Sequence, residues 1–306
     1  MKFIQKNLSL FVVTFFISSI LVANLSISFY NVLSNVSSTS NNIIYEENTD
    51  NSASKDLTDT PVNKYSNDIA DKENISDFSS IETSADVSGV PILYYHSVDP
   101  SEKNEVIISP VKLKEQLTLI KDLGYTTLTI SDFANYILKG EEIPKKSILI
   151  TFDDGYMDNY TNAFPILKEL NMKATIFLIT SGIDDGYYLS TDQIKEMQDY
   201  GIDFESHTVN HKHLNTLTYN EQLNELKNSK EKLEKLLNKK IYSVAYPFGD
   251  YNNDTIKAAK EAGYSFAFTT NLGYAHKNDD LFKLNRIYVS STYSIDTFKD
   301  RLLNTK

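Results

Sequence analysis

Two aspartates and two histidines are the residues of this sequence best suited to chemistry. Asp153 and Asp154 are adjacent in "TFDDG", directly after an apolar run, and His207 and His211 are four residues apart in "SHTVNH". On a helix, that spacing would place both imidazoles on one face, where they could reach one ion. Two histidines and one carboxylate form the ligand set of a catalytic zinc site, and the set also suits other divalent ions.

The adjacent carboxylates could then perform two different tasks. One would bind the metal, whose charge keeps it ionised, while the other would take a proton from water. Taken alone, the pair is equally explained as a helix N-cap and a turn before Gly155. The metalloprotease motif H-E-x-x-H carries its own glutamate base. No glutamate lies between His207 and His211, which argues against a protease.

The elements that would position these residues alternate between strands and helices. Apolar runs of strand length recur along the chain, separated by segments with helical spacing and capping residues. The predicted strands are 91–96, 125–130, 146–154, 173–180, 202–207, 242–247, 265–270 and 284–289, and the predicted helices are 110–123, 131–139, 162–170, 190–200, 218–238, 253–262 and 295–304. Repeated βα units of this kind predict an α/β fold, an open or distorted barrel of seven or eight parallel strands.

Polar residues follow four of the predicted strands. His96, Asp153–Asp154, Ser206–His207 and Tyr246–Pro247 each stand where an apolar run ends. The C-terminal ends of the strands in a parallel barrel meet on one face, and the chemistry of such enzymes gathers there. We therefore expect these four groups to lie together.

Three motifs in this order resemble those of the polysaccharide deacetylases, the carbohydrate esterases that share the chitooligosaccharide deacetylase homology domain. They are "ITFDDGYMDNY", "ESHTVNH" and "AYPFGDYN", and the resemblance covers roughly residues 90–300. The resemblance implies a distorted (β/α)₇-type barrel that hydrolyses acetyl groups from a polysaccharide. It also implies that Asp153 is the general base and that Asp154, His207 and His211 are the metal ligands, with Zn²⁺ as the expected ion and Co²⁺ or Ni²⁺ as alternatives.

The opening "PILYYHSV" resembles the circularly permuted branch of this family, which includes poly-N-acetylglucosamine deacetylases. That resemblance implies that His96 is the acid that protonates the departing amine. It also implies an N-acetylglucosamine polymer, either an exopolysaccharide or peptidoglycan, as the substrate that releases acetate. The backbone N–H of Phe248 matches the position that helps to bind the oxyanion in relatives. An O-acetyl esterase acting on xylan-type glycans shares this machinery and stays open as an alternative.

One position departs from the family pattern. The third motif often carries an arginine that orients the base, and here Ala245 stands at that place. A catalytically impaired sugar-binding relative is therefore a second alternative. Our hypothesis is that Arg286, the only arginine before the last predicted helix, fills the orienting role. Because the chain has no Trp, Tyr246 and Phe248 are the candidates for stacking on a sugar ring.

The N-terminal part of the chain differs from the rest. Two lysines precede a run of 23 uncharged, mostly apolar residues, which is longer than the apolar region of a signal peptide and long enough to span a membrane. Residues 1–33 are therefore predicted as a signal-anchor rather than a cleaved signal peptide. Residues 34–89 are polar and acidic, which predicts a disordered linker before a catalytic domain at 90–306. The domain would lie at the extracellular face of the cell membrane, or be secreted if the segment is cleaved.

The composition excludes several classes of protein. The chain has 306 residues, of which 41% are hydrophobic, enough for one large domain. It has no cysteine, so disulfides and thiolate metal sites are excluded. A net charge of −11 and the lack of a basic stripe argue against a nucleic-acid partner. We expect a monomer whose partners are the polysaccharide and, through the N-terminal segment, the membrane.

Overall fold

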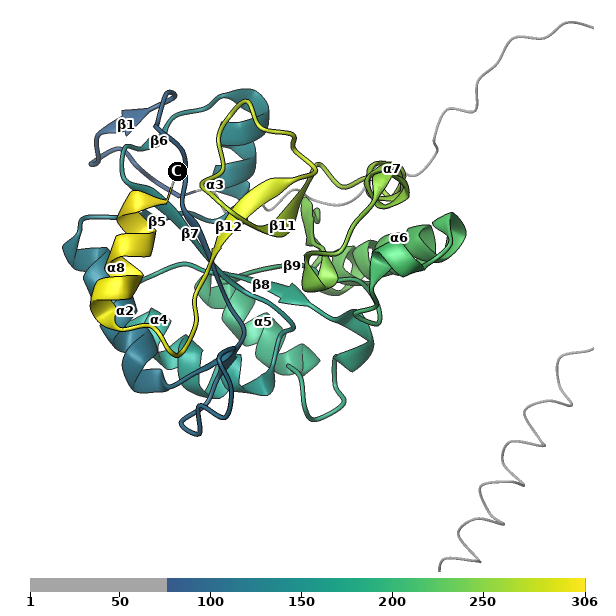
Figure 1. Cartoon of the computed structure of the whole chain (residues 1–306), viewed down its shortest axis with the longest axis horizontal. Helices are drawn as coiled ribbons and strands as arrows, with labels where there is room; N and C mark the ends of the chain where they lie inside the picture. The colour runs from purple at the N-terminus through teal and green to yellow at the C-terminus, as the bar shows by residue number, and fades with distance from the viewer. Residues whose placement is uncertain (1–75, 306) are drawn as a thin grey trace, which may run out of the picture. The chain divides into compact units, whose positions relative to one another are not determined.

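Seven strands form a closed parallel barrel in the computed structural model, which describes residues 76–305 (Figure 1). Strand β2 pairs with β12 on one side and with β7 on the other, and these pairings close the ring. In chain order the ring strands are β2 (Ile92–Tyr95), β7 (Ser147–Phe152), β8 (Thr175–Leu178), β9 (Asp203–Ser206), β10 (Ser243–Ala245), β11 (Phe266–Leu272) and β12 (Leu284–Tyr288). The ring confirms the prediction of an α/β fold with a (β/α)₇-type barrel.

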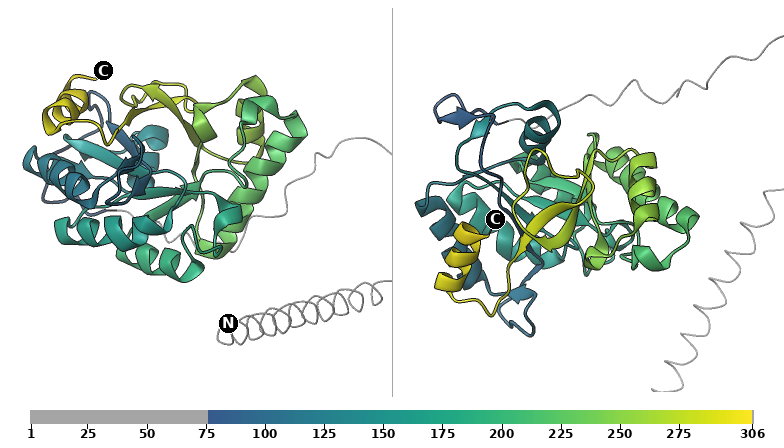
Figure 2. Two further views of the ribbon diagram at one scale, coloured as in Figure 1. Left: turned by 60° about the horizontal axis from the view of Figure 1, so that its bottom comes forward. Right: turned by 45° about the horizontal axis from the view of Figure 1, so that its top comes forward.

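Helices surround the ring, and except for the short helix at residues 130–134 their apolar faces pack on the outer side of the strands (Figure 2). They are α2 (Pro110–Asp122), α3 (Ile130–Ala134), α4 (Phe164–Leu170), α5 (Thr191–Tyr200), α6 (Tyr219–Leu237), α7 (Asn253–Glu261) and α8 (Ile295–Asn304). Shorter elements are β1 (Thr83–Ser84), β3 (Ser97–Val98), β4 (Ile107–Ile108), β5 (Thr126–Thr127), β6 (Ile143–Pro144), η1 (Asn135–Lys139), η2 (Asn159–Ala163), η3 (Thr180–Gly182), η4 (Leu214–Thr216) and η5 (Pro247–Gly249).

The helix starts follow from local side-chain chemistry. Ser190 with Gln193 begins α5, and Thr218 with Glu221 begins α6, each pair bonding the free N–H groups of the other's backbone in a capping box. Gly201 ends α5 in the left-handed conformation, with φ of 108°, which glycine adopts without strain. The observed boundaries of α5 and α6 agree with the predicted ones within two residues, which confirms both predictions.

The interior of the barrel is filled from its N-terminal end by α3. Phe133 on this helix packs against the rings of Phe266 and Phe268, which lie on β11 with centroids 5.6 and 6.1 Å away. Phe268 in turn contacts Phe177 of β8, at 5.5 Å. Because apolar side chains occupy this end, the C-terminal ends of the strands are left for polar groups.

Structured residues lie on the N-terminal side of residue 90, where the catalytic domain was predicted to begin. Residues 76–89, which the composition assigned to the linker, pack on the barrel: both the backbone N–H and the hydroxyl of Ser76 bond the carboxylate of Asp132, at 2.9 and 2.7 Å, and β1 pairs with β6. The composition missed this because the segment is held by polar bonds to distant residues rather than by an apolar pattern. The signal-anchor at 1–33 and most of the linker lie outside the described residues. Among residues 76–305, no helix is long and apolar enough to cross a membrane.

Candidate active site

Asp154, His207 and His211 bring their ligand atoms together at the C-terminal end of the barrel. Oδ1 of Asp154, just after β7, lies 3.4 Å from Nε2 of His207 and 3.3 Å from Nε2 of His211, both in the segment after β9. Within the described chain, these three residues form a group whose ligand atoms all lie within 4.8 Å of one another. The structure therefore brings together the three predicted metal ligands.

The histidine pair lies on a loop and not on a helix, which corrects one premise of the sequence analysis. His207 follows β9 directly, and both Thr208 and His211 have positive φ angles, 68° and 52°. The Thr208 hydroxyl accepts a hydrogen bond from the backbone N–H of His211 at 3.1 Å, and this bond curls the loop back on itself. The curl brings the two imidazoles to one side, with ring centroids 4.8 Å apart.

The donor set fits a divalent cation. Nδ1 of His207 lies 2.8 Å from the carbonyl oxygen of Ala245, so Nδ1 carries a proton, and Nε2, which faces Asp154, is the nitrogen left to bind a metal. Oδ1 of Asp154 is buried and accepts no standard hydrogen bond within residues 76–305. Burial lowers the pKa of His211 to about 4, further depressed by His207, so its imidazole is neutral, as a metal ligand must be. Burial raises the pKa of Asp154, but the neighbouring histidines, His207 first and then His96 and His211, together more than offset this, and the carboxylate stays ionised.

Asp153 forms a bidentate ion pair with Arg286. The two guanidinium nitrogens donate to the two carboxylate oxygens at 2.7 and 2.8 Å, and both side chains are buried. Arg286 comes from β12 and also donates from Nε to the carbonyl of Thr269 at 3.0 Å. Its guanidinium carbon lies 4.3 Å from the centre of the Tyr94 ring. Burial raises the pKa of Asp153, but Arg286, together with His207 and His96, more than offsets this, so the pKa stays below its ordinary value.

His96 lies at the end of β2, beside the same group. Burial lowers its pKa below the ordinary value, although the charges of Asp153 and Asp154 oppose that effect. Its Nδ1 is buried without a hydrogen-bond partner among the described residues, and its ring lies edge-on to Tyr94 at 5.9 Å. Its place beside Asp153 and Asp154, whose negative charges favour the protonated imidazole, suits a proton donor.

The turn η5 after β10 separates the two predicted sugar-stacking residues. Tyr246 is fully buried and stacks on Tyr251, with ring centroids 5.3 Å apart, so the prediction that it contacts a sugar is wrong. Phe248 is 53% exposed, and its ring stacks on His213 at 3.9 Å and contacts His211 at 4.4 Å. Both rings follow the same strand in the sequence, and that position alone does not predict which of the two is buried.

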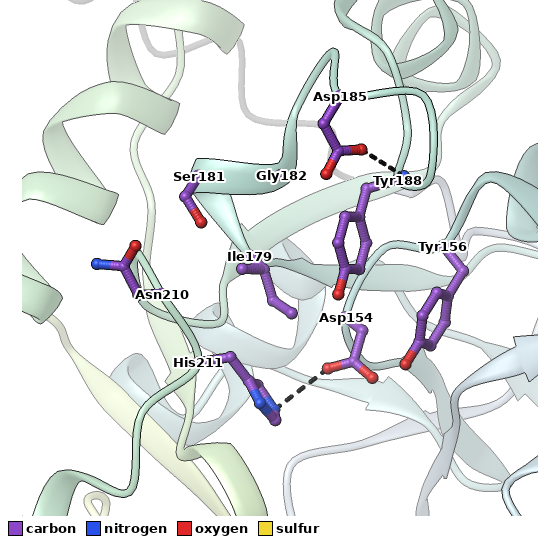
Figure 3. Close-up of a pocket in the computed structure, with 9 residues that line it drawn as sticks. All are labelled: Asp154, Tyr156, Ile179, Ser181, Gly182, Asp185, Tyr188, Asn210 and His211. Carbon is purple, nitrogen blue, oxygen red and sulfur yellow. Dashed lines mark hydrogen bonds and ion pairs between the residues drawn. The ribbon is translucent and has the colours of Figure 1, made fainter.

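A cavity of about 380 Å³ opens beside the metal ligands (Figure 3). The rings of Tyr156 and Tyr188 flank Asp154 there and stack on each other, with centroids 5.4 Å apart. Its remaining walls carry one apolar residue, Ile179, and the small or polar residues Ser181, Gly182, Asp185, Asn210 and His211. The sequence analysis missed these tyrosines, because they lie in loops and only the pairing of Tyr156 with Tyr188 across an isolated bridge brings them to the site.

Comparison with known proteins agrees with this geometry. The family model for polysaccharide deacetylase matches residues 140–267. YxkH of Bacillus subtilis is 38% identical over 209 residues, covering 68% of this chain and 74% of YxkH. The poly-β-1,6-N-acetyl-D-glucosamine N-deacetylase of Staphylococcus epidermidis is 32% identical over 237 residues, covering 73% of this chain and 76% of the relative.

Two solved structures are similar as well. The Streptococcus pyogenes deacetylase PplD, in complex with acetate, superposes with a TM-score of 0.66 at 35% identity, covering 71% of this chain and 99% of PplD. IcaB from Ammonifex degensii superposes with a TM-score of 0.62 at 25% identity, covering 69% of this chain and 94% of IcaB. The chain belongs to the polysaccharide deacetylase family.

Proposed function

We propose that the protein is a metal-dependent N-deacetylase that removes acetyl groups from an N-acetylglucosamine polysaccharide. The observation that carries this proposal is the joint placement of two devices: the Asp154–His207–His211 ligand set and the Asp153–Arg286 pair. A divalent ion on the ligand set, Zn²⁺ by preference with Co²⁺ or Ni²⁺ as alternatives, would polarise the acetyl carbonyl and lower the pKa of water.

Each of the other polar residues at the site then has one task. Asp153 accepts a proton from the water that adds to the acetyl carbon, and Arg286 keeps it oriented and ionised until then. The backbone N–H of Phe248 donates a hydrogen bond to the acetyl oxygen as it gains charge; the loss of such a donor typically costs about 10²–10³ in rate. His96 donates a proton to the nitrogen as the C–N bond breaks. The products are acetate and a free amine.

The substrate proposal rests on the relatives and the cavity. Relatives with 29–32% identity are named poly-β-1,6-N-acetyl-D-glucosamine N-deacetylases, which favours a polymer of N-acetylglucosamine in an exopolysaccharide or in peptidoglycan. The tyrosines beside Asp154 offer flat apolar faces to a sugar ring. The apolar run within residues 1–33 favours a location at the extracellular face of the membrane, where such polymers lie.

Two alternatives to the N-deacetylase are a catalytically impaired sugar-binding protein and an O-acetyl esterase. An impaired sugar-binding relative is disfavoured because Arg286 supplies the charge that Ala245 lacks, through a buried bidentate pair. An O-acetyl esterase would use the same residues on an ester, so only the substrate distinguishes it from an N-deacetylase.

Acetate release from defined substrates tests the proposal. We expect the purified protein to release acetate from β-1,6- or β-1,4-linked N-acetylglucosamine oligomers or from peptidoglycan, to lose the activity in a chelator, and to regain it with Zn²⁺ or Co²⁺. Asp153→Asn should reduce the rate by at least about 10²-fold, because the water loses its proton acceptor. Release from acetylated xylan alone would establish the esterase. A chain that binds metal and releases acetate from none of these substrates would refute the proposed enzyme.

A further inference from the structure

The loop that carries the two histidine ligands needs support from outside itself. Two of its residues, Thr208 and His211, have the left-handed backbone conformation that non-glycine residues adopt at a cost in energy. Such a conformation persists only where the surroundings determine it. On one side, the carbonyl oxygens of Thr208 and Val209 accept hydrogen bonds from the backbone N–H groups of Thr180 and Ser181, at 3.1 and 2.9 Å.

Glu225 of helix α6 holds the other side of the loop. Its Oε2 accepts hydrogen bonds from the backbone N–H groups of Val209 at 3.1 Å and Asn210 at 2.8 Å. Its Oε1 accepts one from the side-chain amide of Asn210 at 2.8 Å and lies 3.2 Å from the ammonium of Lys212. The side chain is buried. Successive backbone N–H groups that point to one place form a concave anion site, and here the anion is a side chain of the same protein.

The position of this carboxylate relates it to the metal ligands. Val209 and Asn210, whose N–H groups it binds, are the residues between the two strained positions and directly before His211. Glu225 contacts none of the three ligands itself, so it acts on the site only through the backbone of the loop. Because α6 packs on β9 and His207 directly follows that strand, one helix ties both histidines to the barrel.

We propose that Glu225 is a positioning residue of the metal site: it presets the 207–211 loop so that the two imidazoles meet Asp154 before the metal binds. This inference rests on the proposed metal-dependent deacetylation. Residues that hold ligands in this way typically contribute about 10–100-fold to metal affinity.

Metal affinity of the full-length protein tests this role. We expect Glu225→Ala to weaken Zn²⁺ binding, measured by chelator competition, by about 10–100-fold. Glu225→Gln should recover most of the loss, because its carbonyl oxygen can still accept both backbone hydrogen bonds, and its amide can donate to the side-chain oxygen of Asn210 once the Asn210 amide turns over. Glu231→Ala, on an exposed position of the same helix, is the matched control and should bind as the wild type does.

Two further measurements separate positioning from general damage. Hydrogen exchange at the amides of Val209 and Asn210 should accelerate in Glu225→Ala and stay slow in Glu225→Gln, while the melting temperature reports the overall fold. Wild-type affinity in a folded Glu225→Ala, or equal losses in the alanine and glutamine variants, would overturn the inference. If the wild-type protein binds Zn²⁺ but releases no acetate, the proposed function fails and the affinity series still decides the role of Glu225.

Discussion

Arg286 and Asp153 place a buried charge pair at the centre of the site. A buried ion costs several kcal/mol of desolvation, and only a well-oriented partner with additional hydrogen bonds repays that cost. Here the guanidinium meets both carboxylate oxygens, donates to Thr269 and lies over the ring of Tyr94. The planar fork of an arginine makes this arrangement, and the single ammonium of a lysine cannot.

Replacing the arginine by lysine should therefore impair the chemistry while sparing the metal. In Arg286→Lys we expect kcat to fall on the order of 10²-fold, because Asp153 loses its fixed orientation toward the water. Zn²⁺ affinity should stay close to that of the wild type, since Arg286 contacts none of the ligands. Steady-state kinetics and chelator competition measure the two effects. An unchanged kcat in a folded, metal-binding variant would remove Arg286 from the mechanism.

At the scale of elements, Phe248 in the turn η5 contributes to the site in two ways, through its backbone N–H and through its ring. Phe248 has a φ of 59° and Gly249 a φ of 75°, so two successive left-handed residues set the direction of the Phe248 N–H. A Cβ at position 249 would lie 2.0 Å from the hydroxyl oxygen of Thr270, which leaves no room for a side chain. The backbone conformation of the turn is thus fixed by packing, while the exposed part of the Phe248 ring can contact a ligand.

Two substitutions in this turn should have opposite kinetic signatures. Phe248→Ala keeps the N–H but removes the exposed ring, so KM for the oligomer should rise by about two- to tenfold with little change in kcat, the range expected for one aromatic contact. Gly249→Ala displaces the backbone, so kcat should fall while KM changes less. A fall in kcat in Phe248→Ala at an unchanged KM would contradict the division between ring and backbone.

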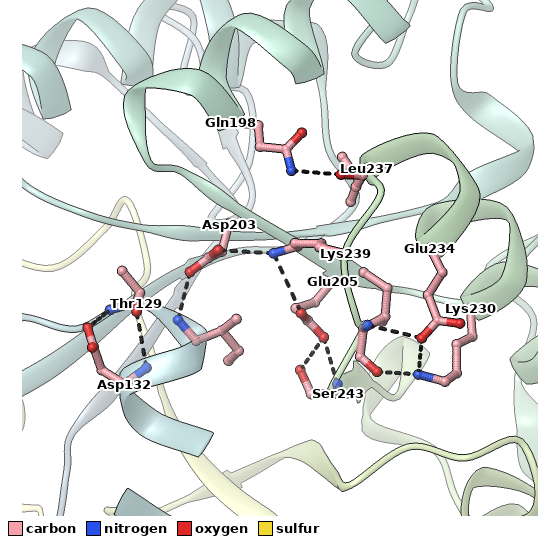
Figure 4. A network of polar contacts seen from close by, with 12 residues as sticks. Thr129, Asp132, Gln198, Asp203, Glu205, Lys230, Glu234, Leu237, Lys239 and Ser243 are labelled. Carbon is pink, nitrogen blue, oxygen red and sulfur yellow. Dashed lines mark hydrogen bonds and ion pairs between the residues drawn. The ribbon is translucent and has the colours of Figure 1, made fainter. Parts of the chain in front are cut away.

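At the scale of the whole molecule, a buried polar network links β9 to β10 and to the segment between α6 and β10 (Figure 4). The ammonium of Lys239 lies 3.0 Å from Asp203 and 4.0 Å from Glu205, both on β9. Glu205 also accepts hydrogen bonds from the backbone N–H and hydroxyl of Ser243 on β10, at 2.6 and 3.1 Å. Burial raises the pKa of Glu205 to about 7, although Lys239 opposes that effect.

This shift makes the stability of the fold depend on pH. A raised pKa means that the folded protein binds the Glu205 proton more tightly than the unfolded chain, so the stabilisation is present at low pH and is lost as the pH rises through about 7. With a chelator present, we expect the unfolding free energy of the wild type to fall between pH 4.5 and 8 relative to that of Glu205→Gln, by about 3 kcal/mol at most. Urea titrations at both pH values measure this difference. Parallel pH profiles for the two proteins would show that Glu205 does not titrate there.

Much of the site follows from local sequence. Apolar runs in the sequence predict the strands that end at His96, at Asp153–Asp154 and at His207. Hydrogen bonds between residues three apart form the caps of α5 and α6. Both features depend only on residues that are close in the chain. The motifs identified the family, and with the strand pattern they predicted a parallel barrel whose C-terminal face carries the polar residues.

Only the tertiary structure decided which residues meet across that face. The pairing of Asp153 with Arg286 joins residues 133 positions apart and requires the ring to close through β2, because β12 and β7 both lie beside that strand. The loop form of the histidine pair depends on contacts from α6 and from η3, which no local pattern reports. Likewise, Tyr246 is buried and Phe248 is exposed because the chain changes direction in the turn η5, which begins directly after Tyr246. Local sequence determines the type of a residue and the element that carries it, whereas its partners depend on how distant elements pack.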